Sequence, residues 1–132
     1  MRDVMRRVGI IGTGRHGSRY ANHILHDIDE LELRAISRRT PAGRDQAAAW
    51  GAAWYQDWNE LVIDQGVDAV ISVVPPSLNL SIAKACAREG KPLLIEKPLA
   101  TTSRDAAEII AVMKAAHCPL TVGQTLRYNP VI

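Results

Sequence analysis

Three glycines near the start of the chain are spaced as G-x-G-x-x-G, in the run Gly12-Thr13-Gly14-Arg15-His16-Gly17. An apolar run precedes them and a segment compatible with a helix follows, which predicts a strand that turns sharply into a helix. The first glycine permits the tight turn, the second lets the backbone approach a pyrophosphate, and the third lets helix and strand pack closely. The start of a helix presents unpaired N–H groups and a positive dipole end, and Arg15 and Arg19 add charge there. We expect a phosphate-binding loop, because a ligand-free turn would not need three glycines at this spacing.

A second polar group follows the next predicted strand. Ser37 lies twenty residues after Gly17, where a dinucleotide-binding fold often has an acid that accepts from the adenosine ribose 2′-hydroxyl. Ser37-Arg38-Arg39 offers a hydroxyl and two guanidiniums instead. Basic residues accommodate a 2′-phosphate, and arginine also stacks on adenine. The pattern favours NADP over NAD as the bound cofactor; the alternative is a solvated basic loop.

A charged pair, Glu96-Lys97, follows the apolar run Leu93-Leu94-Ile95 and precedes Pro98. If the end of this strand is buried, an unpaired charge there is unfavourable unless it serves a function. A partly buried lysine can have a lowered pKa, which suits proton transfer beside a nicotinamide. Lys97 is therefore our candidate catalytic residue, and a salt bridge at the sheet edge is the alternative.

Residues at three further places in the sequence are candidates for contact with the cofactor. Val74-Pro75-Pro76 ends an apolar strand abruptly and would form a rigid wall over the ligand. Asn79 could either cap the following helix or reach the cofactor. Arg127 lies in a polar segment after the last predicted strand and could bind an anionic group, or it could be an ordinary surface residue.

These candidate residues follow the strands of an alternating pattern of strands and helices. We expect strands over Arg7–Ile11, Leu31–Ser37, Ala53–Tyr55, Val67–Val74, Pro92–Glu96 and Leu120–Val122. Helices are expected over Arg15–His26, Pro41–Trp50, Asp57–Asp64, Leu78–Glu89 and Ser103–Ala116. Such alternation predicts an α/β fold with a doubly wound parallel sheet of about six strands and helices on both faces, the Rossmann fold. The ligand then lies at the carboxyl ends of the strands, where the candidate residues would converge.

Composition fits one domain of ordinary globular type, with 132 residues of which 47% are apolar. The net charge of +2 is spread along the chain and forms no basic face of the kind that nucleic acid requires. No apolar run approaches the roughly 20 residues of a membrane span. Cys86 and Cys118 have no metal or redox spacing and are expected to be reduced thiols of a cytoplasmic protein. The four histidines form no metal-ligand grouping.

Taken together, the motifs resemble the Gfo/Idh/MocA family of oxidoreductases over essentially the whole chain. The matching segments are Gly12–Gly17, Val67–Val70, Pro75–Asn79, Gly90–Pro92, Glu96–Pro98 and Val122–Gly123. Glu96-Lys97-Pro98 is the most specific of them. The resemblance implies NAD(P)-dependent oxidation or reduction of a sugar, polyol or related alcohol. It also implies that Lys97 contacts substrate and nicotinamide, that Glu96 lies by the cofactor, and that the Lys97–Pro98 peptide is cis.

The sequence departs from the family at Val74, where many members have Thr, and at Asn79, where many have His. The resemblance further implies that residues 1–123 are the NAD(P)-binding domain and that residues 124–132 begin the connection to a C-terminal substrate domain, which would supply the catalytic acid or base. We therefore expect half of an oxidoreductase, with little activity alone. One alternative is a stand-alone dinucleotide-binding or sensor module that works with a partner chain. Another is a CoA-binding Rossmann-like domain, against which Glu96-Lys97-Pro98 argues.

Overall fold

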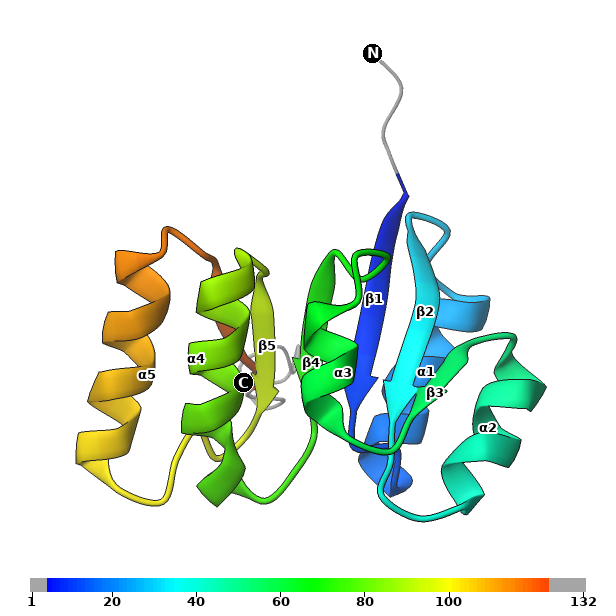
Figure 1. The fold of residues 1–132 in the computed structure, drawn as a ribbon, viewed down its shortest axis with the longest axis horizontal. Coiled ribbons are helices and arrows are strands. Elements are labelled where there is room, and N and C mark those ends of the chain that lie inside the picture. Colours follow the sequence, from blue (N-terminus) through cyan, green and yellow to red (C-terminus); the bar gives the residue numbers. More distant parts are fainter. Residues whose placement is uncertain (1–4, 124–132) are drawn as a thin grey trace, which may run out of the picture.

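A computed structural model describes residues 5–123 and contains one six-stranded sheet in which every strand is parallel to its neighbours (Figure 1). The strand order is β3-β2-β1-β4-β5-β6, so the chain reverses its direction of winding between β1 and β4. The strands are β1 (Arg6–Ile11), β2 (Leu31–Ser37), β3 (Ala53–Tyr55), β4 (Ala69–Ser72), β5 (Leu93–Glu96) and β6 (Leu120–Gly123). This is the doubly wound Rossmann arrangement that the alternating sequence pattern predicts.

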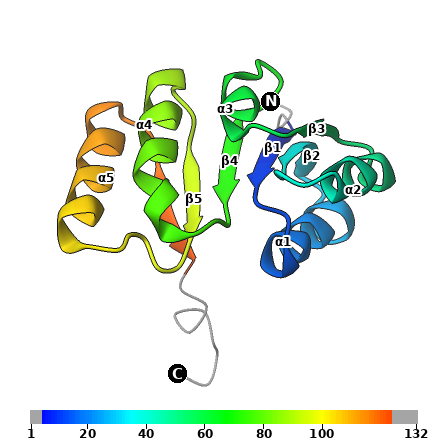
Figure 2. The same ribbon diagram turned by 60° about the horizontal axis from the view of Figure 1, so that its bottom comes forward.

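Five helices cover the two faces of the sheet: α1 (Arg15–His26), α2 (Ala42–Trp50), α3 (Trp58–Ile63), α4 (Asn79–Glu89) and α5 (Ser103–Ala115). In Figure 1, α3, α4 and α5 stand in front of the sheet and α1 lies behind it, and Figure 2 confirms that α1 and α4 lie on opposite sides. Within residues 5–123, none of these helices has the length and apolar character that crossing a bilayer would require.

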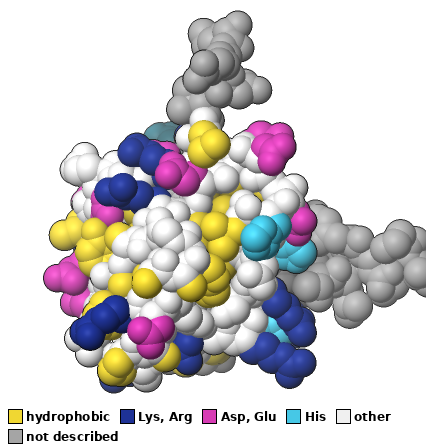
Figure 3. All heavy atoms as spheres, turned by 90° about the vertical axis from the view of Figure 1, so that its right-hand side faces the viewer, with side chains coloured by type: hydrophobic (Ala, Val, Ile, Leu, Met, Phe, Trp, Pro, Cys, Tyr) yellow, Lys and Arg dark blue, Asp and Glu magenta, His cyan; other side chains and the backbone are white. Residues whose placement is uncertain are grey.

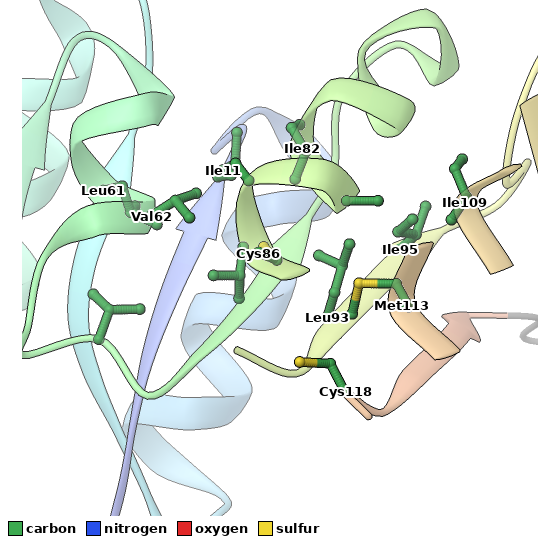
Figure 4. Close-up of a cluster of buried hydrophobic side chains, with 14 of the residues drawn as sticks. Ile11, Leu61, Val62, Ile82, Cys86, Leu93, Ile95, Ile109, Met113 and Cys118 are labelled. Atoms are coloured by element: carbon green, nitrogen blue, oxygen red, sulfur yellow. The ribbon is translucent and has the colours of Figure 1, made fainter. Parts of the chain in front are cut away.

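Two hydrophobic cores lie on the two faces because successive strand residues point in opposite directions. Ile10 belongs to the core under α1 and α2, whereas its neighbour Ile11 belongs to the core under α3, α4 and α5. The second core is the larger and includes Ile82 of α4 and Met113 of α5 (Figure 4). The half of the sheet around β1 and β2 is therefore packed on both faces.

Local signals set most element boundaries. Gly51 and Gly90 follow α2 and α4 with φ angles of +68° and +69°, as expected of glycine caps. The Asp57 side chain accepts from Asn59 N at 2.9 Å and caps α3. At α5 the capping side chain is Thr102, which accepts from Asp105 N at 3.1 Å and so precedes the expected first residue, Ser103.

The fourth strand differs from its prediction in length and in cover. The apolar run Val67–Val74 predicts a strand with cover on both faces, but the ladder of β4 ends at Ser72, and Pro76–Leu78 forms a 3-10 helix before α4. Burial alternates along β4 and β5: Val70 and Ile95 are buried, while Ile71 and Leu94 are half-buried. Among the described residues, therefore, α3, α4 and α5 cover one face of this half of the sheet, whereas the other face is covered only in part, where Ile71 packs against the core under α1. The other face has an apolar groove of about 210 Å³ that Ile71 and Leu94 help to line.

Candidate functional site

All six strands end at the same edge of the sheet because all are parallel. In Figure 1 the arrowheads point to the lower edge, and Figure 2 turns that edge toward the viewer. The glycine loop follows β1, Arg38 follows β2, and Lys97 follows β5. The topology thus brings the candidate residues of three strands to one rim, on either side of the point where the winding reverses.

The three glycines of the loop are required for three different reasons. Gly12 has a φ of +91°, and a Cβ atom added there would lie 2.2 Å from the carbonyl oxygen of Val73. A Cβ atom at Gly17 would lie 1.8 Å from the carbonyl oxygen of Gly12, so α1 could not pack so close to the loop. At Gly14, no heavy atom of the described residues beyond its own chain neighbours and helix backbone lies within 4 Å of such a Cβ.

Packing therefore explains Gly12 and Gly17 but not Gly14, whose exposed backbone faces open space. Within the described part of the chain, no side chain caps the start of α1, and its first turn contains no acid. Backbone N–H groups at an uncapped helix start bind anions. The loop thus has the open cradle and the donors that a pyrophosphate needs.

Thr13 points into the protein rather than toward this cradle. It is 1% exposed, and its hydroxyl donates to Gln46 Oε1 at 2.6 Å. Its carbonyl oxygen accepts from Ser18 Oγ at 3.1 Å, from Gln46 Nε2 at 3.0 Å and from an Arg38 NH group at 3.2 Å. The Thr13 side chain, a predicted cofactor contact, is therefore engaged inside the fold. Sequence reasoning missed Gln46, although a polar residue beside buried Ala47 on the inner face of a helix was an available signal.

The three residues Ser37, Arg38 and Arg39, at the end of β2, have different surroundings in the structure. Ser37 is 4% exposed, and its carbonyl oxygen accepts from Gly12 N at 2.9 Å, so its backbone joins β2 to the loop. Arg38 is half-buried against the loop, and its carbonyl accepts from Trp54 Nε1 at 3.1 Å. Arg39 is exposed and borders a hollow of about 920 Å³. Figure 3, seen from the side of α2, shows several Lys and Arg side chains along the lower rim, where the strands end, and others near the upper end.

Glu96 and Lys97 do not form the pair that the sequence suggested. The Tyr20 hydroxyl of α1 donates to Glu96 Oε2, and burial together with the Glu96 carboxylate raises the pKa of Tyr20. Lys97 is exposed, and no ion pair joins it to Glu96 within the described residues. The premise of a partly buried Lys97 is therefore wrong, because the chain leaves the sheet immediately after Glu96. The Lys97–Pro98 peptide is cis, as the resemblance implied.

Lys97 nevertheless lies on the same side of the sheet as the glycine loop. It shares a cavity of about 460 Å³ with residues of α1, the helix that begins at this loop. The cavity is lined by His16, Arg19, Tyr20, His23, Glu96 and Lys97. Lys97 thus borders a space that reaches the first turn of α1, where His16 lies.

The remaining candidates are distributed around the rim. Asn79 is 1% exposed: its Oδ1 accepts from Ser72 Oγ at 3.0 Å, and its Nδ2 donates to Leu99 O at 3.1 Å. It therefore links β4 to the loop after β5 and does not reach the cradle. Val74 packs against Gly12, with 3.1 Å from its Cγ1 to an added Cβ. Pro75 is exposed and Pro76 begins the 3-10 helix, while Arg127 lies outside the described residues.

An open glycine cradle at a helix start, placed where a doubly wound parallel sheet reverses, defines a dinucleotide-binding domain. Comparison with known proteins gives the family. The chain belongs to the Gfo/Idh/MocA oxidoreductase family, NAD-binding Rossmann fold, which it matches over residues 6–124. The family expected from the motifs is thus confirmed.

Relatives at moderate identity share this domain. Inositol 2-dehydrogenase 1 of Saccharopolyspora erythraea is 36% identical in an alignment 129 residues long, which covers 94% of this chain and 38% of that protein. A 4-carboxy-2-hydroxymuconate-6-semialdehyde dehydrogenase of Sphingobium is 32% identical over 94% of this chain and 40% of that protein. The crystal structure of apo scyllo-inositol dehydrogenase from Lactobacillus casei matches with a TM-score of 0.91 and 25% identity, over 98% of this chain and 39% of that one. The chain thus spans about two fifths of the length of these relatives.

Proposed function

We propose that this domain binds the cofactor of an NAD(P)-dependent oxidoreductase acting on a sugar, polyol or related alcohol. The observation that carries the proposal is the glycine at position 14, which no packing contact of the described residues requires and which faces open space at an uncapped helix start. Two relatives named as inositol dehydrogenases support the substrate class. In the proposed complex the pyrophosphate lies on Gly14 and the start of α1, and the nicotinamide lies toward Lys97.

Lys97 is the proposed catalytic residue. A bound nicotinamide supplies the site that accepts or donates a hydride. The Lys97 side chain borders the cavity beside α1. As a neutral amine it can accept the proton of the substrate alcohol during oxidation, and as an ammonium it can return a proton to the substrate oxygen during reduction. Glu96 is held by Tyr20 and keeps the end of β5 in place next to Lys97. The remaining acid or base is assigned to the substrate domain.

We also propose that the cofactor is NADP in preference to NAD. Two guanidiniums, Arg38 and Arg39, follow β2, and the acid that would accept from a ribose 2′-hydroxyl is absent from Ser37–Arg39. Asp57 also borders the hollow beside Arg39, but its carboxylate is engaged in capping α3. We expect NADPH to bind about tenfold more tightly than NADH in fluorescence titrations at physiological salt, and Arg39→Ala to reduce that difference. Tighter binding of NADH would contradict the preference.

The domain organisation is part of the proposal. Residues 1–123 form the cofactor domain, and residues 124–132 begin the connection to a substrate domain of the same polypeptide. The relatives, which are more than twice as long, and the apolar groove on the second face of β4 and β5 support this division. The chain alone should then bind cofactor without turning over substrate.

Thermal unfolding with three ligands tests the cofactor assignment. At a hundred times its dissociation constant, a ligand stabilises the folded state by about 2.7 kcal/mol. We expect NADP and NAD to raise the melting temperature of the chain and CoA to leave it unchanged. Stabilisation by CoA alone would favour a CoA-binding domain, and stabilisation by none of the three would contradict the proposal.

A further inference from the structure

The carbonyl oxygen of Thr13 accepts from three donors that come from different parts of the chain: Ser18 on α1, Arg38 after β2, and Gln46 on α2. Gln46 differs from the other two because it contacts both polar groups of Thr13. Its Oε1 accepts from the Thr13 hydroxyl at 2.6 Å, and its Nε2 donates to the Thr13 carbonyl at 3.0 Å. It is half-buried and also lies 3.4 Å from Ser18 Oγ.

The orientation of the Thr13 carbonyl decides the orientation of the next N–H group. Among the described residues only the Lys97–Pro98 peptide is cis, so the Thr13–Gly14 peptide is trans. In a trans peptide the C=O and N–H bonds point in opposite directions. Because Gln46 draws the Thr13 carbonyl toward α2, the Gly14 N–H points away from α2. Hydrogen bonds to the carbonyl also polarise the peptide and strengthen its N–H as a donor.

We propose that Gln46 is a positioning residue, which fixes the Gly14 N–H for a ligand pyrophosphate without touching the ligand itself. This inference rests on the proposed function, because it assigns the pyrophosphate to Gly14. Gln46 lies 33 residues from Thr13 in the sequence and holds the loop from α2. The loop is thereby held in its binding geometry before any ligand arrives, which reduces the ordering needed on binding.

Loss of Gln46 should weaken binding of the pyrophosphate but not of the adenosine ribose, because other contacts hold Arg38 at the end of β2. The Arg38 backbone is fixed independently, since its carbonyl accepts from Trp54 Nε1 and its N–H donates to Tyr55 O at 3.2 Å. Loss of Gln46 therefore leaves the Thr13 carbonyl with its Ser18 and Arg38 donors only, which loosens the Thr13–Gly14 peptide. The end of β2, where the adenosine ribose is proposed to bind, stays in place. Ligands with and without a pyrophosphate should respond differently.

The test compares two ligands on the 132-residue chain. One is 2′-phospho-ADP-ribose, which has the pyrophosphate, and the other is adenosine 2′-monophosphate, which lacks it. Gln46→Met keeps the side-chain length but removes the hydrogen bonds. We expect it to weaken binding of 2′-phospho-ADP-ribose about tenfold, the equivalent of roughly one hydrogen bond, and to change binding of adenosine 2′-monophosphate less than about twofold. Gln65→Met, at an exposed turn after α3, is the matched control.

A second variant and a spectroscopic measurement keep the test decisive if Gln46→Met folds poorly. Gln46→Glu still accepts from the Thr13 hydroxyl but cannot donate to its carbonyl, so it should show the same selective loss. In either variant the 1H–15N resonance of Gly14 should shift without ligand, whereas Gln65→Met should leave it unchanged. Equal losses for both ligands, or no loss for either, would overturn the role of Gln46 alone. Failure of the unsubstituted chain to bind 2′-phospho-ADP-ribose would overturn this role and the proposed function together.

Discussion

Alanine substitution can distinguish the role of Gly14 from the roles of Gly12 and Gly17. The φ of Gly14, −72°, is negative, and an added Cβ meets open space, so Gly14→Ala should change the melting temperature of the ligand-free chain little. The methyl group would occupy the cradle, and we expect the affinity for NADPH to fall by at least about tenfold, which a fluorescence titration measures.

Gly17→Ala provides the opposite control. Its Cβ would lie 1.8 Å from the carbonyl oxygen of Gly12, so the backbone must move and the chain should lose about 1–3 kcal/mol of stability or more. Normal NADPH binding by Gly14→Ala would mean that the open space at Gly14 does not receive the cofactor.

Lys97 should act on turnover rather than on cofactor binding. In the full-length enzyme to which we assign this domain, Lys97→Ala should reduce kcat about 100-fold or more, the usual contribution of a positioned acid or base, and change the Kd for NADPH little. Lys114→Ala, at an exposed position on α5, is the control. Steady-state kinetics and cofactor titration measure the two effects. An unchanged kcat would show that Lys97 takes no part in catalysis.

At the scale of elements, the pairing of β1 with the start of β4 carries a pH-sensitive contact. Hydrogen bonds from the side chain and backbone N–H of Arg7 lower the pKa of Asp68. Because the folded-state pKa is below the unfolded value of about 3.9, the stabilisation is present above that value and is lost as pH falls through the folded-state pKa. Asp68→Asn should therefore cost about 1 kcal/mol or less at pH 7, with a difference from the unsubstituted chain that narrows below pH ~4.

Urea denaturation at pH 7 and pH 3 measures this difference. Lys84 and Glu108 form a second ion pair, between α4 and α5. Lys84→Met removes this ion pair and serves as the control, because the Lys84–Glu108 pair lacks the backbone hydrogen bond that Asp68 accepts from Arg7. A difference between Asp68→Asn and the unsubstituted chain that stays constant down to pH 3 would contradict the assignment.

Element boundaries were predictable where the signal was local. The bounds of α1 and β2 agree with those predicted, because the glycine loop and the alternation over Leu31–Ser37 lie within the elements that they specify. Contacts between distant segments were not predictable. Tyr20 and Glu96 are 76 residues apart, and neither lies in a sequence pattern that predicts its contact with the other. The expected burial of Lys97 failed for a related reason, since an apolar strand predicts its own burial but not that of the residue after it.

At the scale of the whole molecule, the two faces of β4 and β5 differ in what covers them. Ile95 is fully buried under α4 and α5, whereas Leu94 on the opposite face is half-buried and borders the apolar groove. A continuous apolar strand normally has cover on both faces. The proposed substrate domain of the same polypeptide would supply the second cover, so Leu94 should contribute differently to the isolated domain and to the full-length enzyme.

Polar substitution on each face tests this difference. Leu94→Asn should change the stability of the 132-residue chain by about 0.5 kcal/mol or less, but should destabilise the full-length enzyme by about 2 kcal/mol or more, because the amide would then be buried without partners. Ile95→Asn should destabilise both forms strongly, since its site is closed in the domain itself. Chemical denaturation of the two forms measures these effects. Equal tolerance of Leu94→Asn in both would mean that the second face of β4 and β5 stays open to solvent in the complete enzyme, and the domain arrangement proposed above would be wrong.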